Sequence, residues 1–208
     1  MKRKPILTPV GTAVWPKLNE PETRWKPEGE YMVDLRLSEK AGAALIKELT
    51  SFYDEAYKWF CSTEGKKKLK KATSMPWKFV ESGDGEKTGE VDFKFKLKAR
   101  VETRRGDSFT QAVAIFDSEG KPMTELVGGG STLRVRGEMN PWYTGSLGFG
   151  ISLWVKAVQV KTLVELASNG SAKSWGFDGM EGGFTTSEDL EFVDTVAPLD
   201  PDATDEDF

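Results

Sequence analysis

"VDFKFKLKAR", residues 91–100, alternates apolar and charged side chains along its whole length. Successive side chains of a β-strand point to opposite faces of the sheet. One face of this strand would carry Val91, Phe93, Phe95 and Leu97, and is predicted to face a core. The other face would carry a row of cations, Lys94, Lys96, Lys98 and Arg100. The stretch therefore predicts a half-buried strand with a basic outer face.

Further strand patterns dominate the first 167 residues. Residues 30–38, "EYMVDLRLS", show the same two-residue alternation. Similar runs are "FTQAVAIF" (109–116), "STLRVRGEM" (131–139) and "GFGISLWVKAVQV" (148–160). A basic connection, "GKKKLKKATSMP" (65–76), and a turn-rich loop, "SGDGEKTGE" (82–90), lie between the runs 30–38 and 91–100. These features predict a mainly β fold.

One amphipathic helix is expected at residues 39–60. Ser38 offers an N-cap, and apolar side chains follow at three- and four-residue steps, at Leu45, Leu49, Phe52, Ala56 and Trp59. Short strands separated by glycine and charged turns, with a single helix, favour a small barrel with a helical insertion.

Composition argues against an enzyme. The 208-residue chain has no histidine, which removes the commonest general base and a common zinc ligand. The phosphate-loop pattern G-x-x-x-x-G-K-[ST] is not met in "GDGEKTGE", and the acidic pairs near the end lack calcium-loop spacing. Cys61, on the expected helix, is interpreted as a packing residue. We expect no catalytic residues, no metal and no cofactor.

The chain is expected to be cytoplasmic. Its one cysteine cannot form an internal disulfide, which fits a reducing compartment. No stretch approaches the roughly 18 apolar residues of a membrane span, and the start, "MKRKPILTPVG", lacks a signal-peptide core.

Charge divides the chain into two parts. Through Phe177 there are 29 Lys and Arg against 22 Asp and Glu, whereas the part from Asp178 holds 11 acids and no bases. The segment 168–208 is rich in Gly, Ser, Thr, Asp and Glu without sustained periodicity, so we expect a folded domain at 1–167 and a disordered acidic tail at 168–208. The tail ends in Asp205, Glu206, Asp207 and Phe208. One interpretation is a solvated tail that aids solubility; the other is a mimic of a polyanion that the basic body binds.

The cation row is consistent with a nucleic-acid strand. Alternate residues of a β-strand are about 6.6–7 Å apart, close to the separation of successive phosphates. Further cations are expected nearby, namely Arg104 in the following turn and Arg134 and Arg136 on another strand. An ordinary solvated sheet face is the alternative, because lysines also discourage edge aggregation.

Binding of unpaired bases also needs aromatic surface. "NPWYTGS" is read as a loop opened by Asn140 and Pro141, and it would expose Trp142 and Tyr143 for stacking. Trp15, Trp25, Trp77 and Phe79 are further candidates, although most tryptophans in a globular domain serve packing. These patterns leave RNA or an acidic protein open as the ligand, because cations and rings do not read the 2′-hydroxyl.

A family resemblance narrows these choices. "GTAVWPKLNEP", "FKFKLKAR", "AVAIFDSEGKPM" and the long stretch from "GGGSTLRVRGEMNPWYTGS" to "LVEL", with the closing "DEDF", together resemble the single-stranded DNA-binding protein of T7-like phages. The resemblance implies a five-stranded OB-fold barrel with an inserted helix, a homodimer and sequence-tolerant binding of single-stranded DNA. It also implies a role in DNA replication, recombination and repair in an infected bacterial host, and a tail that contacts the phage DNA polymerase and helicase-primase. By motif position it points to Lys94 and Lys96 as DNA contacts.

Overall fold

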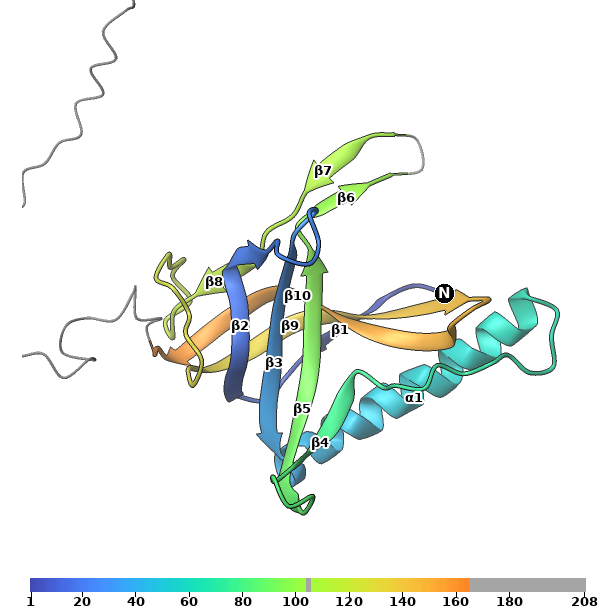
Figure 1. Cartoon of the computed structure of the whole chain (residues 1–208), viewed down its shortest axis with the longest axis horizontal. Coiled ribbons are helices and arrows are strands. Elements are labelled where there is room, and N and C mark those ends of the chain that lie inside the picture. Colours follow the sequence, from blue (N-terminus) through green and yellow to red (C-terminus); the bar gives the residue numbers. More distant parts are fainter. Residues whose placement is uncertain (104–105, 165–208) are drawn as a thin grey trace, which may run out of the picture. The chain divides into compact units, whose positions relative to one another are not determined.

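The computed structural model describes residues 1–103 and 106–164 (Figure 1). This described part is mainly β, with one α-helix, as the sequence predicts. The elements are β1 (Lys4–Leu7), β2 (Gly11–Glu22), β3 (Glu30–Ser38), α1 (Glu39–Thr63), β4 (Trp77–Glu81), β5 (Lys87–Lys98), β6 (Arg100–Glu102), β7 (Ser108–Thr110), β8 (Ala114–Phe116), β9 (Thr132–Thr144) and β10 (Gly148–Thr162). The predicted tail, 168–208, lies outside the described residues, so the predicted domain boundary stays a prediction.

β3 and β5 form the centre of the main sheet. They run antiparallel and side by side (Figure 1), in register from the pair Glu30 and Lys98 to the pair Ser38 and Glu90. Their apolar alternate positions are all buried: Tyr31, Val33, Leu35, Leu37, Val91, Phe93, Phe95 and Leu97. The alternation read from the sequence is therefore confirmed on both strands, and it determines which side chains remain outside.

Five strands pair in a closed ring. The main sheet follows the order β1-β9-β2-β3-β5-β10-β8, and β9 pairs in addition with β10. β2, β3, β5, β10 and β9 thus each have a neighbour on both sides. The pair β5–β10 is parallel, whereas the other four pairs of the ring are antiparallel. The strands of the ring contribute aromatic and aliphatic side chains to one buried core, among them Phe93, Phe95, Leu133, Val135, Phe149 and Val155.

Helix α1 begins where predicted and ends three residues later than predicted. The Ser38 side chain accepts a hydrogen bond from the Ala41 amide at 3.3 Å, as an N-cap does. The helix runs alongside the β9–β10 hairpin (Figure 1), and Tyr53 packs edge-on against Phe149 of β10 at 4.9 Å. A Cβ atom on Gly42 would overlap Val91, so glycine allows α1 to approach β5 closely. In the part of the chain that the structure describes, no helix is long and apolar enough to cross a membrane.

Three sequence predictions about strands were wrong in detail. The run 109–116 is not one strand: β7 pairs with β6 in a separate hairpin, and β8 pairs with β10. The loop 82–90 is shorter than expected, because β5 already begins at Lys87 and pairs there with β4. The sequence pattern does not reveal this start, because the first three residues of β5 are all exposed and show no apolar alternation.

The third correction concerns "NPWYTGS". Asn140–Thr144 belongs to β9 and pairs with β10 down to a tight turn at residues 145–147. Pro141 is tolerated in this strand because the pairing of β9 with β1 ends at Met139, so no neighbour on that side requires an amide donor. Trp142 and Tyr143 are therefore strand residues and not loop residues.

Candidate nucleic-acid interface

Strand β5 presents its lysines on the outer face of the ring. Lys94 and Lys98 are exposed, and Lys96 between them is partly buried. Arg100 lies beyond a break at Ala99, in β6, where its guanidinium is 3.4 Å from the Ser108 hydroxyl. The predicted row is thus a row of three lysines, with Arg100 displaced into the β6–β7 hairpin.

Carboxylates on β3 and the preceding loop neutralise part of this row. Glu30 is buried, and its two oxygens accept hydrogen bonds from Lys26 at 2.6 Å and from Lys96 at 3.1 Å. Lys98 lies 4.0 Å from Glu28. Among the residues that the structure describes, Lys94 makes no ion pair within 4.0 Å. Lys94 is therefore the most available cation of the three, and Lys96 is shared with Glu30.

The fold favours the ionised form of Glu30. Burial raises the pKa of Glu30, but hydrogen bonds and charge attraction from Lys26 and Lys96 outweigh burial, so this pKa lies below its ordinary value of 4.5. A lowered pKa means that the bridge stabilises the fold fully above about pH 4.5. Its contribution is lost as the pH falls through the lowered pKa.

Replacing Glu30 with glutamine should therefore have opposite effects on stability and on anion binding. The free energy of unfolding should fall by about 1 kcal/mol at neutral pH, because two partly exposed lysines lose a charged partner. In urea denaturation, the difference from the unaltered protein should shrink as the pH falls below 4.5 and vanish once the pH is below the lowered pKa of Glu30. Affinity for oligonucleotides should rise, because Lys96 is released.

Glu55→Gln is the matched control, since it removes the same charge from an exposed position of α1. A Glu30→Gln protein with unchanged stability at every pH would show that the bridge does not form in solution.

Trp154 lies beside these lysines. It is in register with Lys96 on the parallel neighbour strand β5. The Arg3 guanidinium carbon lies 4.0 Å from the centre of the indole, and the Lys156 ammonium lies 5.5 Å from it. Trp154 and Lys96 also line a pocket of about 420 Å³ together with Lys98, Gln111 and Ser152. We call the surface formed by Arg3, Lys94, Lys96, Trp154 and Lys156 the Trp154 face.

Sequence reasoning missed Trp154, although a signal was present. In residues 148–160 the buried positions Ile151, Leu153 and Val155 alternate with Ser152, Trp154 and Lys156. A large aromatic ring in the polar phase of a strand therefore has to lie on the outer face. That ring combines an aromatic surface with cations beside it, of which Arg3 and Lys156 also pair with Glu138 at 3.6 and 3.8 Å.

The two aromatic residues favoured from sequence differ in their surroundings. Trp142 lies opposite Gly150, and a Cβ atom there would overlap the indole, so this ring packs flat on β10. Tyr143 packs against the core, with its ring 6.4 Å from Phe60. Neither ring projects freely, although Trp142 is partly exposed on the outer face.

The remaining aromatic candidates differ in their exposure to solvent. Trp15 and Trp25 are 81% and 82% exposed. Trp15 has a φ of 49° at an irregularity between β2 and β3, a conformation that is strained for a bulky residue. Trp77 packs against the core, whereas Phe79 is exposed on β4.

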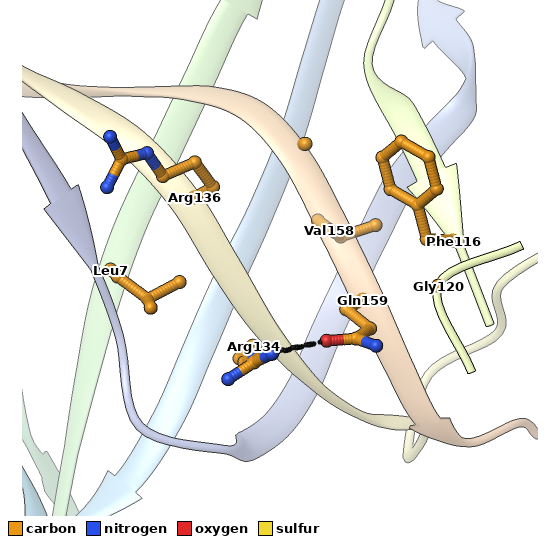
Figure 2. A pocket seen from close by; sticks show the side chains of 8 residues that line it. Leu7, Phe116, Gly120, Arg134, Arg136, Val158 and Gln159 are labelled. Atoms are coloured by element: carbon orange, nitrogen blue, oxygen red, sulfur yellow. Dashed lines mark hydrogen bonds between the residues drawn. The ribbon is translucent and has the colours of Figure 1, made fainter. Parts of the chain in front are cut away.

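Arg134 and Arg136 lie further along the outer face of β9. Figure 2 shows Arg134 bonded to Gln159, whose side-chain oxygen accepts two hydrogen bonds at 2.9 and 2.6 Å. Both arginines line a pocket of about 380 Å³ with Leu7, Phe116 and Val158. The pocket that Trp154 and Lys96 line contains neither arginine. Arg104 and the tail residues Asp205 to Phe208 lie outside the described residues.

A family model described as "Single-stranded DNA-binding protein, Bacteriophage T7" matches residues 12–166. No curated protein matches the chain. The fold is similar to the crystal structure of gp2.5, a single-stranded DNA-binding protein encoded by bacteriophage T7, with 24% identity and a TM-score of 0.66 over 89% of this chain and 100% of that one.

Two structures of the single-stranded DNA-binding protein from bacteriophage Enc34 are also similar. The C-terminally truncated form has 12% identity and a TM-score of 0.56, over 77% of this chain and 87% of that chain. The form in complex with single-stranded DNA has 16% identity and a TM-score of 0.55, over 79% and 89%. These likenesses show the fold, while the family match spans most of the described domain. The chain therefore belongs to the family of the single-stranded DNA-binding protein of bacteriophage T7.

Proposed function

We propose that this protein coats single-stranded DNA through the Trp154 face, without reading its sequence, during phage DNA replication, recombination and repair. The observation that carries the proposal is the Trp154 indole, with Arg3 and Lys156 against it and Lys96 in register beside it. An aromatic surface among cations supplies both stacking for a base and charge for the flanking phosphates. Membership of a DNA-binding family makes the chain a binding protein and not an enzyme.

The strand connections support an OB-fold assignment for the domain. Five strands pair in the ring order β2-β3-β5-β10-β9. In the chain, α1 lies between the second and third of these strands, β3 and β5. An OB-fold binds oligonucleotides on the face of its second and third strands, here β3 and β5, and on adjoining loops. The Trp154 face shares β5 with that surface and adds the neighbouring strand β10. The similar Enc34 protein, solved in complex with single-stranded DNA, adds support from a relative.

The proposal is tested by comparing three ligands of equal length. Fluorescently labelled oligo-dT of about 15 nucleotides, the matching RNA and a duplex should be titrated at two salt concentrations. We expect the DNA single strand to bind tighter than the duplex, with an affinity that falls as salt rises. Tighter binding of RNA would favour an RNA-binding function. Absence of binding to all three would favour an acidic protein as the ligand and would contradict the proposal.

The acidic end is included in the proposal as a recruiting segment. The 11 acids of residues 178–208, and the resemblance of the closing "DEDF" to the end of the phage protein, support a contact of this end with the phage DNA polymerase and helicase-primase. A homodimer and a location in the cytoplasm of an infected bacterium belong to the same proposal. Dimerisation is measured by sedimentation of the full chain, in which a monomer at micromolar concentration would contradict it.

Substituting Lys94 and Lys96 with alanine together should weaken binding and reduce its salt dependence. Each phosphate contact on a single strand contributes about 0.7 to the slope of log affinity against log salt, so the slope should fall by up to about 1.4. The fold should be retained, because the buried side chains of β5 are on its opposite face. Fluorescence anisotropy at several salt concentrations measures the slope.

Lys40→Ala with Lys47→Ala provides the matched control, because both lysines are exposed on α1. An unchanged slope in a folded Lys94→Ala/Lys96→Ala protein would place the phosphate path elsewhere.

A further inference from the structure

A second pocket lies beside the Trp154 face, at Lys94. It has a volume of about 480 Å³, within the range of 300–1,000 Å³ that is usual for sites that hold small molecules. One wall is formed by residues 73–79, which run along β5, with the Pro76 carbonyl accepting a hydrogen bond from the Lys94 amide at 2.9 Å. Asp34 and Lys94 form another part of the lining, from neighbouring positions on β3 and β5.

Asp34 is an acceptor without a donor in this pocket. Asp92, the other acid that lines it, is held by Arg36 in two hydrogen bonds at 2.8 and 3.0 Å. In the described ranges, the Asp34 carboxylate makes neither a hydrogen bond nor an ion pair, although it is half-buried. An ionised carboxyl group can only accept hydrogen bonds, so the Asp34 carboxylate is free to accept one from water or from a bound ligand.

The charges around Asp34 agree with this geometry. Burial raises the pKa of Asp34, and Asp92 raises it further, while Lys94, Lys78 and Lys96 lower it; the net direction is upward. The cost of burial therefore exceeds the support from the lysines, and a bound hydrogen-bond donor would offset that cost. Met75 and Phe79 contribute apolar surface to the same lining, against which a flat ring can pack.

We infer that this pocket binds a nucleobase that carries an exocyclic amino group, with Asp34 accepting a hydrogen bond from that amino group. The inference rests on the proposed function, because the base would belong to the strand held at the Trp154 face. Asp and Glu accept well from the cytosine amino group, whereas uracil and thymine present a carbonyl oxygen at that position, which a carboxylate repels. Lys94 can donate to a carbonyl oxygen of the same base or to its phosphate.

The pocket would give a base preference to a protein that otherwise binds single strands of any sequence. Stacking on Trp154 and contacts to phosphates do not distinguish bases, because every base has an aromatic face. Asp34 is only half-buried, so we take the ordinary net strength of a hydrogen bond, which changes affinity by about fivefold to tenfold. Cytosine strands should therefore bind about fivefold to tenfold tighter than uracil strands of equal length.

The test uses oligo-dC and oligo-dU of about 15 nucleotides at neutral pH, because these strands lack the thymine methyl group and both contain pyrimidines. The full-length protein should show the stated preference for oligo-dC. Asp34→Val, which removes the acceptor, should reduce the ratio of the two affinities to within about twofold. Asp34→Asn, which offers a donor and an acceptor equally, should lie between. Asp84→Asn, an exposed change in the loop before β5, is the charge-matched control and should keep the full ratio.

Each result has one meaning. Failure of the unaltered protein to bind either strand would contradict the proposed function itself. Equal affinity of the unaltered protein for both strands would overturn the base pocket alone. An equal rise for both strands in Asp34→Val and Asp34→Asn, with the ratio retained, would show that Asp34 acts only as a negative charge near the strand, and this too would overturn the inference.

Discussion

Replacing Trp154 with alanine should lower the affinity for a short oligo-dT by about 5- to 150-fold, which corresponds to about 1–3 kcal/mol for one stacked base. The salt slope should stay nearly unchanged, because no charged side chain is removed. Trp154 is partly exposed on the outer face of β10, so the domain should fold normally. Anisotropy of a labelled oligonucleotide measures both quantities without depending on tryptophan fluorescence.

Two further variants separate stacking from general damage. Trp154→Phe should recover most of the lost affinity, because a phenyl ring retains an aromatic face. Trp59→Ala removes an exposed tryptophan from α1 and should leave DNA affinity unaltered. A Trp154→Ala protein that binds as tightly as the unaltered protein would show that bases stack elsewhere.

Removing residues 178–208 should strengthen single-strand binding by about tenfold at low salt and abolish the proposed contacts with the polymerase and the helicase-primase. The composition predicts a flexible segment, and a flexible segment of 31 residues reaches about 30 Å. Its 11 acids can therefore meet the cations of the Trp154 face at about millimolar effective concentration. They would compete with DNA phosphates, and DNA would release them for a protein partner. Salt should shrink the gain, because it screens charge attraction.

Deleting Phe208 alone distinguishes charge from the terminal ring. This change removes no charged side chain, so DNA affinity should be nearly retained, whereas the partner contact should weaken. Affinities for DNA and for each partner should be measured for both truncations at low and moderate salt. If the long truncation binds DNA no tighter at low salt, the acidic end is not a competitor; if loss of Phe208 leaves partner binding intact, the ring is not its anchor.

Local periodicity was sufficient to predict the centre of the fold. In β3, and in β5 from Val91 onward, every second residue is apolar, and burial of one face requires no knowledge of the partner strand. The start of α1 was equally predictable, because Ser38 caps the helix through contacts within one turn. Elements whose pattern is complete within about ten residues could thus be read directly.

Features that depend on distant pairing could not be read in this way. The neutralisation of Lys96 by Glu30 joins residues 66 positions apart and follows from the register of β3 on β5. Pro141 indicated a loop, but it is accommodated where the pairing of β9 with β1 ends, which no local pattern reveals. For the same reason Arg134 and Arg136, expected to join the lysines, lie around another pocket.

In the proposed complex, single-stranded DNA crosses the Trp154 face. The most direct measurement is photochemical cross-linking of the full-length protein to an oligo-dT that contains bromodeoxyuridine, followed by mass spectrometry of the attached peptides. We expect the main cross-link at Trp154, abolished by excess unlabelled oligo-dT and moved or lost in Trp154→Ala. Cross-links confined to Trp15, Trp59 or Phe116, with none at Trp154, would contradict the account.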